Sequence, residues 1–220
     1  MSDFSASDRT RVRRLPDRGH YDAATVHAII DEALVCHLGF AIEGRPFVIP
    51  VLHARRDGEL LVHGASSSRL LRHIEAGHEV CATMTLLDGL VLAKTAFDQS
   101  VNYRSVVVFG TGHLVDTPEE KLDALRRFTE RLMPGQWDYV RAPSAQELKA
   151  TSILAIPITE ASAKVRGGPP KDDEADRGRP TWAGVVPFRH AALDPVPAEY
   201  SAPGVEVPAH VRAYVERHRG

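Results

Sequence analysis

The chain has 220 residues, with 29 acidic and 27 basic side chains and no long block of either sign. This balance excludes the basic surface typical of nucleic-acid-binding domains and favours a small, neutral or locally anionic ligand. The length suits one main domain with decorated ends, which needs no disulfide or structural metal for stability.

The two cysteines, Cys36 and Cys81, both lie in apolar runs and form no CxxC pair. Reduced, buried thiols of this kind are typical of cytosolic proteins. The N-terminus has no apolar signal-peptide core, and no apolar stretch is long enough to span a bilayer. We therefore expect a soluble cytoplasmic protein that contacts no membrane and no nucleic acid.

The first half of the chain predicts an arm, a helix and three strands. Residues 1–20 are polar and rich in arginine, so they form an arm that is mobile or laid on a surface. Asp22 is a plausible N-cap for the run AATVHAIIDEAL, whose apolar residues have helical spacing. The segments VCHLGFAI, FVIPVLHA and LLVHG follow as consecutive antiparallel strands separated by turn residues.

The next segments alternate between helix and strand. SSSRLLRHIEAG predicts a short helix with serines at its start and Gly77 at the C′ position. EVCATMTLL, LVLAKTAF and NYRSVVVFGTGHLVD predict three strands, the first two joined by a turn at Asp88-Gly89. Thr117 caps the strongest helix, TPEEKLDALRRFTERLM, and Ser144 opens a short helix, SAQELKA, through a capping box.

The run TSILAIPITEASAKV closes the sheet, and Pro157 inside it indicates an edge position or a bulge. About seven strands with few helices, in an order that is not βαβ, predict a mainly β (α+β) fold, a split or closed antiparallel β-barrel. We expect an N-terminal arm (1–20), a barrel domain (21–167) and a proline-rich C-terminal loop and tail packing on the barrel (168–220) that ends in a modest helix.

Several common catalytic and binding motifs are missing. The chain has no GxGxxG after a strand, no GxxxxGK[ST], no HExxH and no GxSxG. The histidines are scattered over different elements without an i, i+4 or HxH pair, so no metal site is predicted.

One polar cluster follows the third strand, where His63 and Gly64 lead into Ser66, Ser67, Ser68 and Arg69. Hydroxyls and a guanidinium beside a helix start suit a phosphate. The alternative is that the serines only cap the helix, and for this segment alone that interpretation is favoured because serine is so common at N-caps.

A second cluster precedes the apolar run Val106 to Phe109. Strand alternation places Asn102, Arg104, Val106 and Val108 on one face and Tyr103, Ser105, Val107 and Phe109 on the other. Arg104 is then a cation at the end of an apolar face, where we expect an anion to pair with it. The alternative is that its guanidinium lies in water at the rim of the barrel. A ligand with a phosphate at one end and a flat apolar ring at the other, such as flavin mononucleotide (FMN), fits both clusters.

The stretch from FVIPVLHARRDGELLVHG through ASSSRLLRHIEAG to NYRSVVVFGTGHLV closely resembles the pyridoxamine 5′-phosphate oxidase-like FMN-binding split-barrel family. The resemblance runs from about residue 11 to 188 and is greatest for the branch related to nitroimidazole-resistance proteins. It implies a split β-barrel homodimer with FMN at the interface between subunits.

By position, the resemblance implies that the four residues of VIPV lie along the flavin ring and ribityl chain. It also implies that His63 and Gly64 lie beside the ribityl chain. It assigns the serine-arginine pair to a phosphate clamp and makes the FMN phosphate the anion that Arg104 meets. The cofactor-binding residues expected are Val48, Ile49, Pro50, Val51, His63, Gly64, Ser67, Ser68, Arg69, Lys94, Asn102, Tyr103, Arg104, Ser105 and Trp182.

The chain departs from the oxidase at two points. Leu70 stands where the oxidase has a lysine after the serine-arginine pair, so Lys94 or Arg104 would have to replace that lysine. The oxidase's C-terminal arginine-histidine substrate signature is missing, which argues against vitamin B6 oxidase activity. Trp182 in WAGVVPF offers an aromatic cover for the flavin instead.

These observations favour an FMN-dependent oxidoreductase that takes reducing equivalents from NADH, NADPH or another reductant and passes them to a small organic acceptor. No catalytic acid or base is identified, and His63 is the only candidate to name. The alternative is a non-catalytic flavin- or haem-binding protein that serves storage, sensing or detoxification.

Overall fold

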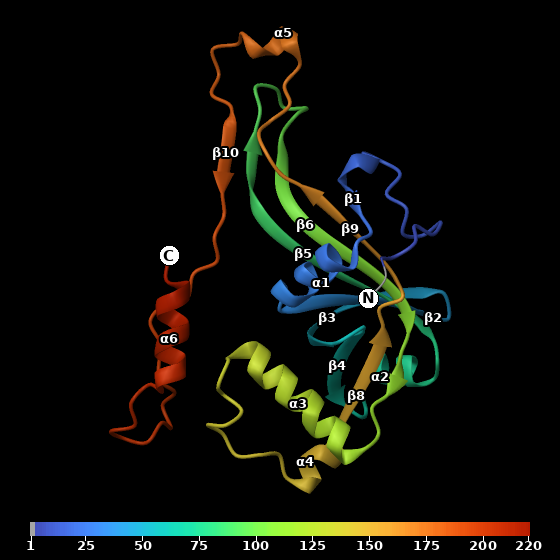
Figure 1. Cartoon of the computed structure of the whole chain (residues 1–220), viewed down its shortest axis with the longest axis vertical. Coiled ribbons are helices and arrows are strands. Elements are labelled where there is room, and N and C mark those ends of the chain that lie inside the picture. The colour runs from blue at the N-terminus through green and yellow to red at the C-terminus, as the bar shows by residue number, and fades with distance from the viewer. Residues whose placement is uncertain (1–2) are drawn as a thin grey trace.

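The computed structural model describes residues 3–220, which form a ten-stranded antiparallel sheet with helices at its periphery (Figure 1). The strands are β1 (Gly19–His20), β2 (Val35–Ile42), β3 (Arg45–Arg56), β4 (Glu59–Ala65), β5 (Glu79–Leu92), β6 (Ser100–Thr111), β7 (His113–Leu114), β8 (Thr151–Pro157), β9 (Glu160–Arg166) and β10 (Gly184–Pro187). The helices are η1 (Pro16–Arg18), α1 (Ala23–Glu32), α2 (Arg69–Glu75), α3 (Pro118–Leu132), α4 (Ala145–Ala150), α5 (Glu174–Arg177) and α6 (Ala209–His218).

The strand order confirms the mainly β, split-barrel fold expected from the sequence. Hydrogen-bonded neighbours run β1-β9-β6-β5-β2-β3-β4-β8-β7, and β10 pairs with β5. The long strand β3 links the two halves, because its first part pairs with β2 and its last residues, His53 to Arg56, pair with β4. Each part of β3 therefore pairs with one neighbouring strand.

The main core fills the space between the halves of the barrel. Inward-facing residues of β2, β4, β5, β6 and β8 meet the apolar face of α1, whose Val26, Ile29 and Ile30 are buried. The Asp22 carboxylate accepts a hydrogen bond from the Thr25 N–H at 2.8 Å, so the predicted N-cap of this helix is confirmed. A smaller core forms where Ala124 and Phe128 of α3 pack against the barrel.

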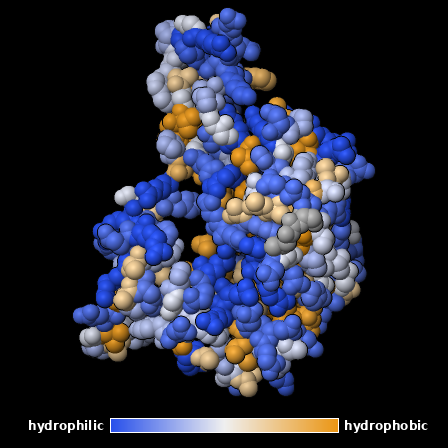
Figure 2. All heavy atoms as spheres, in the orientation of Figure 1, coloured by the Kyte–Doolittle hydropathy of each residue, from blue (hydrophilic) through white to orange (hydrophobic). Residues whose placement is uncertain are grey.

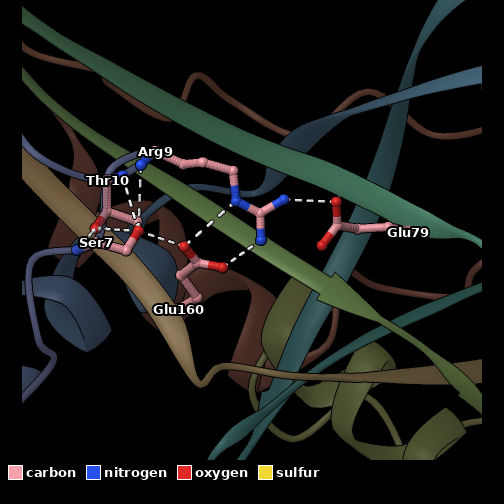
Figure 3. A network of polar contacts seen from close by, with 5 residues as sticks. All are labelled: Ser7, Arg9, Thr10, Glu79 and Glu160. Atoms are coloured by element: carbon pink, nitrogen blue, oxygen red, sulfur yellow. Dashed lines mark hydrogen bonds and ion pairs between the residues drawn. The ribbon is translucent and has the colours of Figure 1, made fainter.

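The N-terminal arm lies on the barrel surface over the residues that the structure describes. The Arg9 guanidinium donates to Glu79 at the start of β5, at 2.5 Å, and to Glu160 at the start of β9, while Ser7 also donates to Glu160 (Figure 3). Arg9 thus ties the arm to two strands. Residues 1 and 2 of the predicted arm lie outside the described residues.

The predicted hairpin turn at Asp88-Gly89 is wrong. Residues 79–92 form one strand that pairs with β6 throughout, and Asp88 is the extra residue at a bulge between Leu87 and Gly89. Gly89 is needed for a different reason: a Cβ there would lie 2.7 Å from the backbone oxygen of Val186 on β10. β5 also ends at Leu92, so Phe97 of the expected strand LVLAKTAF lies in the following loop and is almost fully exposed.

The predicted closing strand is two strands that belong to different parts of the sheet. β8 pairs with β4 and β7, whereas β9 pairs with β6 and β1. Pro157 is the last residue of β8 and pairs only with Glu59 of β4, so it has the edge position that the sequence indicates. The strand expected through residue 116 is similarly divided into β6 and the short β7.

After β9 the C-terminal segment follows the β5–β6 end of the sheet, where Asn102 and Lys94 donate hydrogen bonds to it, and it then pairs with β5 through β10. Residues 188–220, which we call the C-terminal arm, then descend beside the body and end in α6 (Figure 1). Figure 2 shows a gap between this arm and the rest of the molecule. Within residues 3–220, no helix combines the length and apolar character that crossing a membrane requires.

Candidate functional site

A surface pocket of about 450 Å³ opens beside α2 and contains part of the predicted phosphate clamp. Ser67 and Arg69 line it, as the sequence predicts. Three further polar residues and two apolar residues complete its wall: Arg72, His73 and His78, with Ile42 and Ala76. The pocket is therefore lined by two guanidinium groups and two imidazole rings.

The serine side chains at the start of α2 do not cap the helix. Ser68 is the N-cap residue, but its hydroxyl accepts no hydrogen bond from the helix backbone. Only backbone groups close the turn, through Ser68 N–H to Ala65 O at 2.8 Å. The capping interpretation thus does not explain these serines, and their hydroxyls are free to meet a ligand.

Arg69 is held by an aromatic ring instead of a carboxylate. Its guanidinium carbon lies 4.3 Å from the ring centroid of Phe47 on β3, which is cation–π geometry. In residues 3–220, no carboxylate lies within ion-pair distance of Arg69 or Arg72. The pocket therefore carries two cations whose charge no described residue neutralises.

The two histidines of the pocket were not predicted as site residues. The rings of His73 and His78 stack with centroids 4.7 Å apart, and His73 also contacts Phe40 at 5.1 Å. Their spacing of five follows no helical or strand period. They meet because the chain reverses at Gly77, whose φ is +80°, so the Gly77 turn was the only signal in the sequence.

The residues of the VIPV segment of β3 face two ways, and none of them lines the pocket beside α2. Ile49 and Val51 point into the main core, as strand alternation requires. Val48 and Pro50 point outward, and Val48 is 66% exposed. The outer face of β3 therefore offers an apolar surface that the described chain leaves uncovered.

His63 and Gly64 end β4 next to α2 and α3. The His63 ring packs 4.4 Å from the ring of Phe128, and its Nδ1 atom is buried without a hydrogen-bond partner in the described chain. Burial lowers the pKa of His63, which keeps its imidazole neutral near pH 7. A Cβ at Gly64 would lie 3.2 Å from Leu71, so this position keeps β4 close to α2.

Arg104 has a different environment from the one predicted. Its guanidinium donates to Asp88 on β5, with Nη2 2.8 Å from Oδ1, and to both oxygens of Glu32 at the end of α1. These hydrogen bonds raise the pKa of Arg104, and the bond to Arg104 lowers the pKa of Glu32. The anion that meets Arg104 within this chain is thus a pair of carboxylates of the protein itself.

Lys94 does not replace the missing lysine of the clamp within one chain. It follows β5, and its Nζ donates to the carbonyl oxygens of Arg177 and Arg179, each at 2.7 Å. Trp182 lies near the same end of the sheet and is 65% exposed. Both residues belong to the end of the molecule that carries α5, far from α2 in Figure 1.

The other predicted residues of β6 have intramolecular partners. Asn102, which is buried, donates to the carbonyl oxygen of Gly168 at 3.2 Å and accepts from Arg166. The Ser105 hydroxyl donates to the Lys164 carbonyl at 3.3 Å. Tyr103 is half-buried. Asn102, Val106 and Val108 are buried on one face, which confirms the predicted alternation.

The predicted site residues therefore form two groups that a single chain does not bring together. One surrounds the pocket beside α2 and the outer face of β3, and the other lies along β6 and the β5–β6 end. In the part of the chain that the structure describes, no group of three or more His, Cys, Asp or Glu side chains could hold a bare metal ion.

The strand order defines the class of split-barrel proteins. Residues 22–165 match the family model described as pyridoxamine 5′-phosphate oxidase. The chain belongs to this flavin-binding family, as the resemblance in the sequence implied. Among curated proteins there is no significant match.

Two solved structures resemble almost the whole chain. The flavocytochrome Anf3 from Azotobacter vinelandii is 40% identical with a TM-score of 0.89, and the match covers 96% of this chain and 98% of that one. An FAD- and haem-binding protein from Mycobacterium smegmatis is 30% identical with a TM-score of 0.86, covering 90% of this chain and 97% of that one.

A third structure shares only the fold. It is a proposed 5-nitroimidazole antibiotic resistance protein from Bacteroides thetaiotaomicron, with 21% identity and a TM-score of 0.57 over 67% of this chain and 86% of that one. The branch of the family named from the sequence is thus represented among the similar structures.

Proposed function

We propose that the protein binds a flavin and transfers its electrons to a small organic acceptor. The observation that carries this proposal is the set of uncommitted polar groups at the pocket beside α2. Within residues 3–220, the hydroxyls of Ser67 and Ser68 have no acceptor and the guanidinium of Arg69 has no carboxylate partner, and all three groups suit a phosphate.

The residues present fit the FMN portion of a flavin. Ser67, Ser68 and Arg69 would hold the phosphate, with Arg72 supplying the second positive charge that Leu70 lacks. The exposed apolar face of β3, at Val48 and Pro50, would support the ring. His63 and Gly64 would border the ribityl chain between them. FMN is the simplest flavin that meets these contacts.

The flavin supplies the redox chemistry when bound, and the protein supplies orientation and solvent exclusion. His63, the only candidate acid or base named from the sequence, is kept neutral by burial, which suits packing or hydrogen bonding to the cofactor. We propose NADH, NADPH or another reductant as the electron donor.

We also propose that the site forms between two subunits. The second group of predicted residues, along β6 and at Lys94 and Trp182, lies too far along the sheet to join the pocket of its own chain. In a homodimer, this group would approach the flavin from the partner. The barrel domain of residues 21–167 would hold the flavin and residues 168–220 would act as its tail.

A cytoplasmic location accords with the two thiols. Cys36 and Cys81 are unpaired, and burial raises the pKa of both, to about 12 for Cys36. Such thiols persist in a reducing compartment.

The test is to purify the protein and record its absorbance spectrum before and after adding FMN. We expect a yellow protein with flavin bands and one flavin per chain, and reduction of these bands by NADH or NADPH under anaerobic conditions. A protein that stays colourless after FMN is added and the excess removed contradicts the proposal.

A second candidate function is a protein that holds FAD and haem. The observation that favours it is the length of the similarity: the family model ends at residue 165, but the matches to the flavocytochrome and to the FAD- and haem-binding protein extend over most of the segment that follows. The non-catalytic alternative, in which these cofactors serve storage, sensing or detoxification, remains within this candidate.

The donor set of the pocket fits a haem. His73 and His78 offer imidazole nitrogens for the iron, and Arg72 offers a partner for a propionate. A pyridine haemochrome spectrum of the purified protein separates the cofactors, since haem gives sharp bands that flavin does not. Loss of those bands in the variant His73→Ala, with flavin retained, would assign the iron ligand.

A further inference from the structure

The tip of the C-terminal arm carries large apolar side chains that touch almost nothing in their own chain. Leu193 is 83% exposed, Val196 is 90% exposed and Tyr200 is 93% exposed. All three lie in the irregular stretch between β10 and α6. Burying apolar side chains away from water stabilises a folded protein, and these three side chains are not buried in the monomer. They therefore contribute almost nothing to the stability of a single chain.

The base of the arm is nevertheless firmly placed on its own chain. β10 pairs with β5 from Gly184 to Pro187. At the other end, His210 of α6 hydrogen-bonds to Gln136 at 2.8 Å and packs on Tyr139. The arm is thus attached at both ends while the stretch between them stands away from the barrel, as the gap in Figure 2 shows.

The arm also has an internal order that makes it a defined shape. The Ala192 N–H donates to the carbonyl oxygen of His218 at 3.0 Å, and Arg219 pairs with Asp194 at 2.7 Å. These contacts tie the irregular segment of the arm after β10 to α6. The exposed apolar side chains are therefore presented on a supported structure and not on a free tail.

A complementary apolar surface lies uncovered on the barrel of the same molecule. The outer face of β2 and β3 exposes Val35 and Val48, which are 46% and 66% exposed, together with Pro50. An interface with two-fold symmetry requires each copy to supply both a projecting element and the surface that receives it. This chain has both a projecting element, the C-terminal arm, and an uncovered apolar surface on β2 and β3. The arm does not cover that surface in its own chain.

We propose that the C-terminal arm reaches onto a second copy of the chain, where Leu193, Val196 and Tyr200 cover the outer face of the partner's β3 and complete its flavin site. This inference rests on the proposed function, because the covered face is the one assigned to the flavin ring. The barrel would supply one wall and the phosphate clamp, and the partner's arm would exclude water from the other side.

The match with the flavocytochrome covers 96% of this chain, so most of the C-terminal arm has a counterpart in that structure.

The test is a complementation experiment with two full-length variants. The clamp variant is Arg69→Ala, and the arm variant combines Leu193→Ser, Val196→Ser and Tyr200→Ser. Each is given a different affinity tag, the two are produced together, and heterodimers are isolated by two affinity steps. FMN and FAD are the probes, and bound flavin is counted by absorbance after the excess is removed.

If the arm acts on the partner, the heterodimer has one intact site, made by the clamp of one chain and the arm of the other. We expect about one flavin per heterodimer and close to none in either parental homodimer. If each arm serves its own chain, both sites of the heterodimer are defective, and a heterodimer without flavin overturns the proposal.

Two further outcomes overturn it by different routes. An arm variant that retains as much flavin as the wild type shows that these side chains do not cover the site. A wild-type chain that sediments as a monomer with bound flavin shows that no second copy is needed. Failure of the wild type to bind FMN or FAD, in contrast, overturns the proposed function itself.

Discussion

The guanidinium of Arg104 lies 2.8 Å from a carboxylate oxygen of Asp88, the residue at the bulge of β5. The bulge inserts Asp88 between the residues paired with Tyr103 and Asn102, and so aims its side chain at the neighbouring strand. Glu32 approaches the same guanidinium from the end of α1. Arg104 therefore joins α1 to the sheet through two of the protein's own carboxylates.

We expect Arg104→Ala to lower the free energy of unfolding by about 1 kcal/mol, because the pair is partly exposed and solvent screens it. Urea titration measures the change. Arg127→Ala is the matched control, since Arg127 pairs with Asp123 on the surface of α3 at 2.7 Å, and it should cost less. Equal losses in the two variants would contradict a joining role for Arg104.

The same pair predicts a pH dependence. The pKa of Glu32 is lowered in the folded protein by its hydrogen bond to Arg104. Its stabilising contribution is therefore present above the unfolded pKa of about 4.3 and is lost as the pH falls through the lower folded value. Stability curves of the wild type and Glu32→Gln should converge at acid pH, and curves that stay parallel would contradict this.

His53 is buried in the barrel wall, where its Nε2 lies 2.9 Å from the carbonyl oxygen of Ile30 and donates to it. Desolvation lowers the pKa of His53 to about 4. The unfolded chain, with a pKa near 6.5, takes up a proton first as the pH falls, so stability is complete above pH 6.5 and decreases toward pH 4.

The His53 contribution to this acid destabilisation should reach about 3 kcal/mol. His53→Gln keeps an amide donor for the carbonyl of Ile30 but cannot titrate. We expect this variant to lose less stability than the wild type between pH 6.5 and pH 4, measured by urea unfolding at several pH values. Identical slopes in both proteins would show that His53 does not titrate as inferred.

Gly89 lets β10 approach β5, since a Cβ at this position would lie 2.7 Å from Val186 O. We expect Gly89→Ala to cost about 1–3 kcal/mol and to speed proteolysis of the chain after residue 167, because the overpacked contact weakens the anchor of the C-terminal arm. Gly178→Ala is the control, since a Cβ there meets no atom within 4 Å. Unchanged cleavage of the Gly89 variant would refute the anchoring role.

Arg69→Ala should remove a charge-assisted contact worth about 1.5–3 kcal/mol and weaken flavin retention about 10- to 150-fold. Arg126→Ala, on the exposed face of α3, serves as a control for loss of one surface charge. Equilibrium dialysis against FMN compares the dissociation constants. If retention by the Arg69 variant matches that of the Arg126 variant, the clamp has been assigned to the wrong residue.

Local signals in the sequence correctly predicted features that depend on residues close together in the chain. The caps at Asp22, Thr117 and Ser144 were each confirmed, because an N-cap depends on residues three positions apart. Gly77 also ends α2 with a positive φ as expected. The turn at Asp88-Gly89 failed, since aspartate and glycine there serve an ion pair and a close strand approach that no short window contains.

Some residues of the candidate site could likewise be proposed from the sequence, and others were found only in the structure. The serine-arginine segment could be proposed as a phosphate clamp from the sequence because its residues are adjacent in the chain and the family motif contains them together. Arg72, His73 and His78 were missed because only the reversal at Gly77 brings them into one pocket. The assignment of Arg104 to a phosphate overlooked Glu32, which is 72 residues away.

By itself, the sequence determined the barrel class, the caps of α1, α3 and α4 and the family, since these follow from hydrophobic period, capping chemistry and contiguous motifs. Only the tertiary structure decided which charges are already neutralised, which strands continue through an apparent turn and which apolar side chains remain uncovered. Those properties depend on contacts between residues far apart in the chain, and burial and charge pairing are set by the assembled surfaces and not by local order.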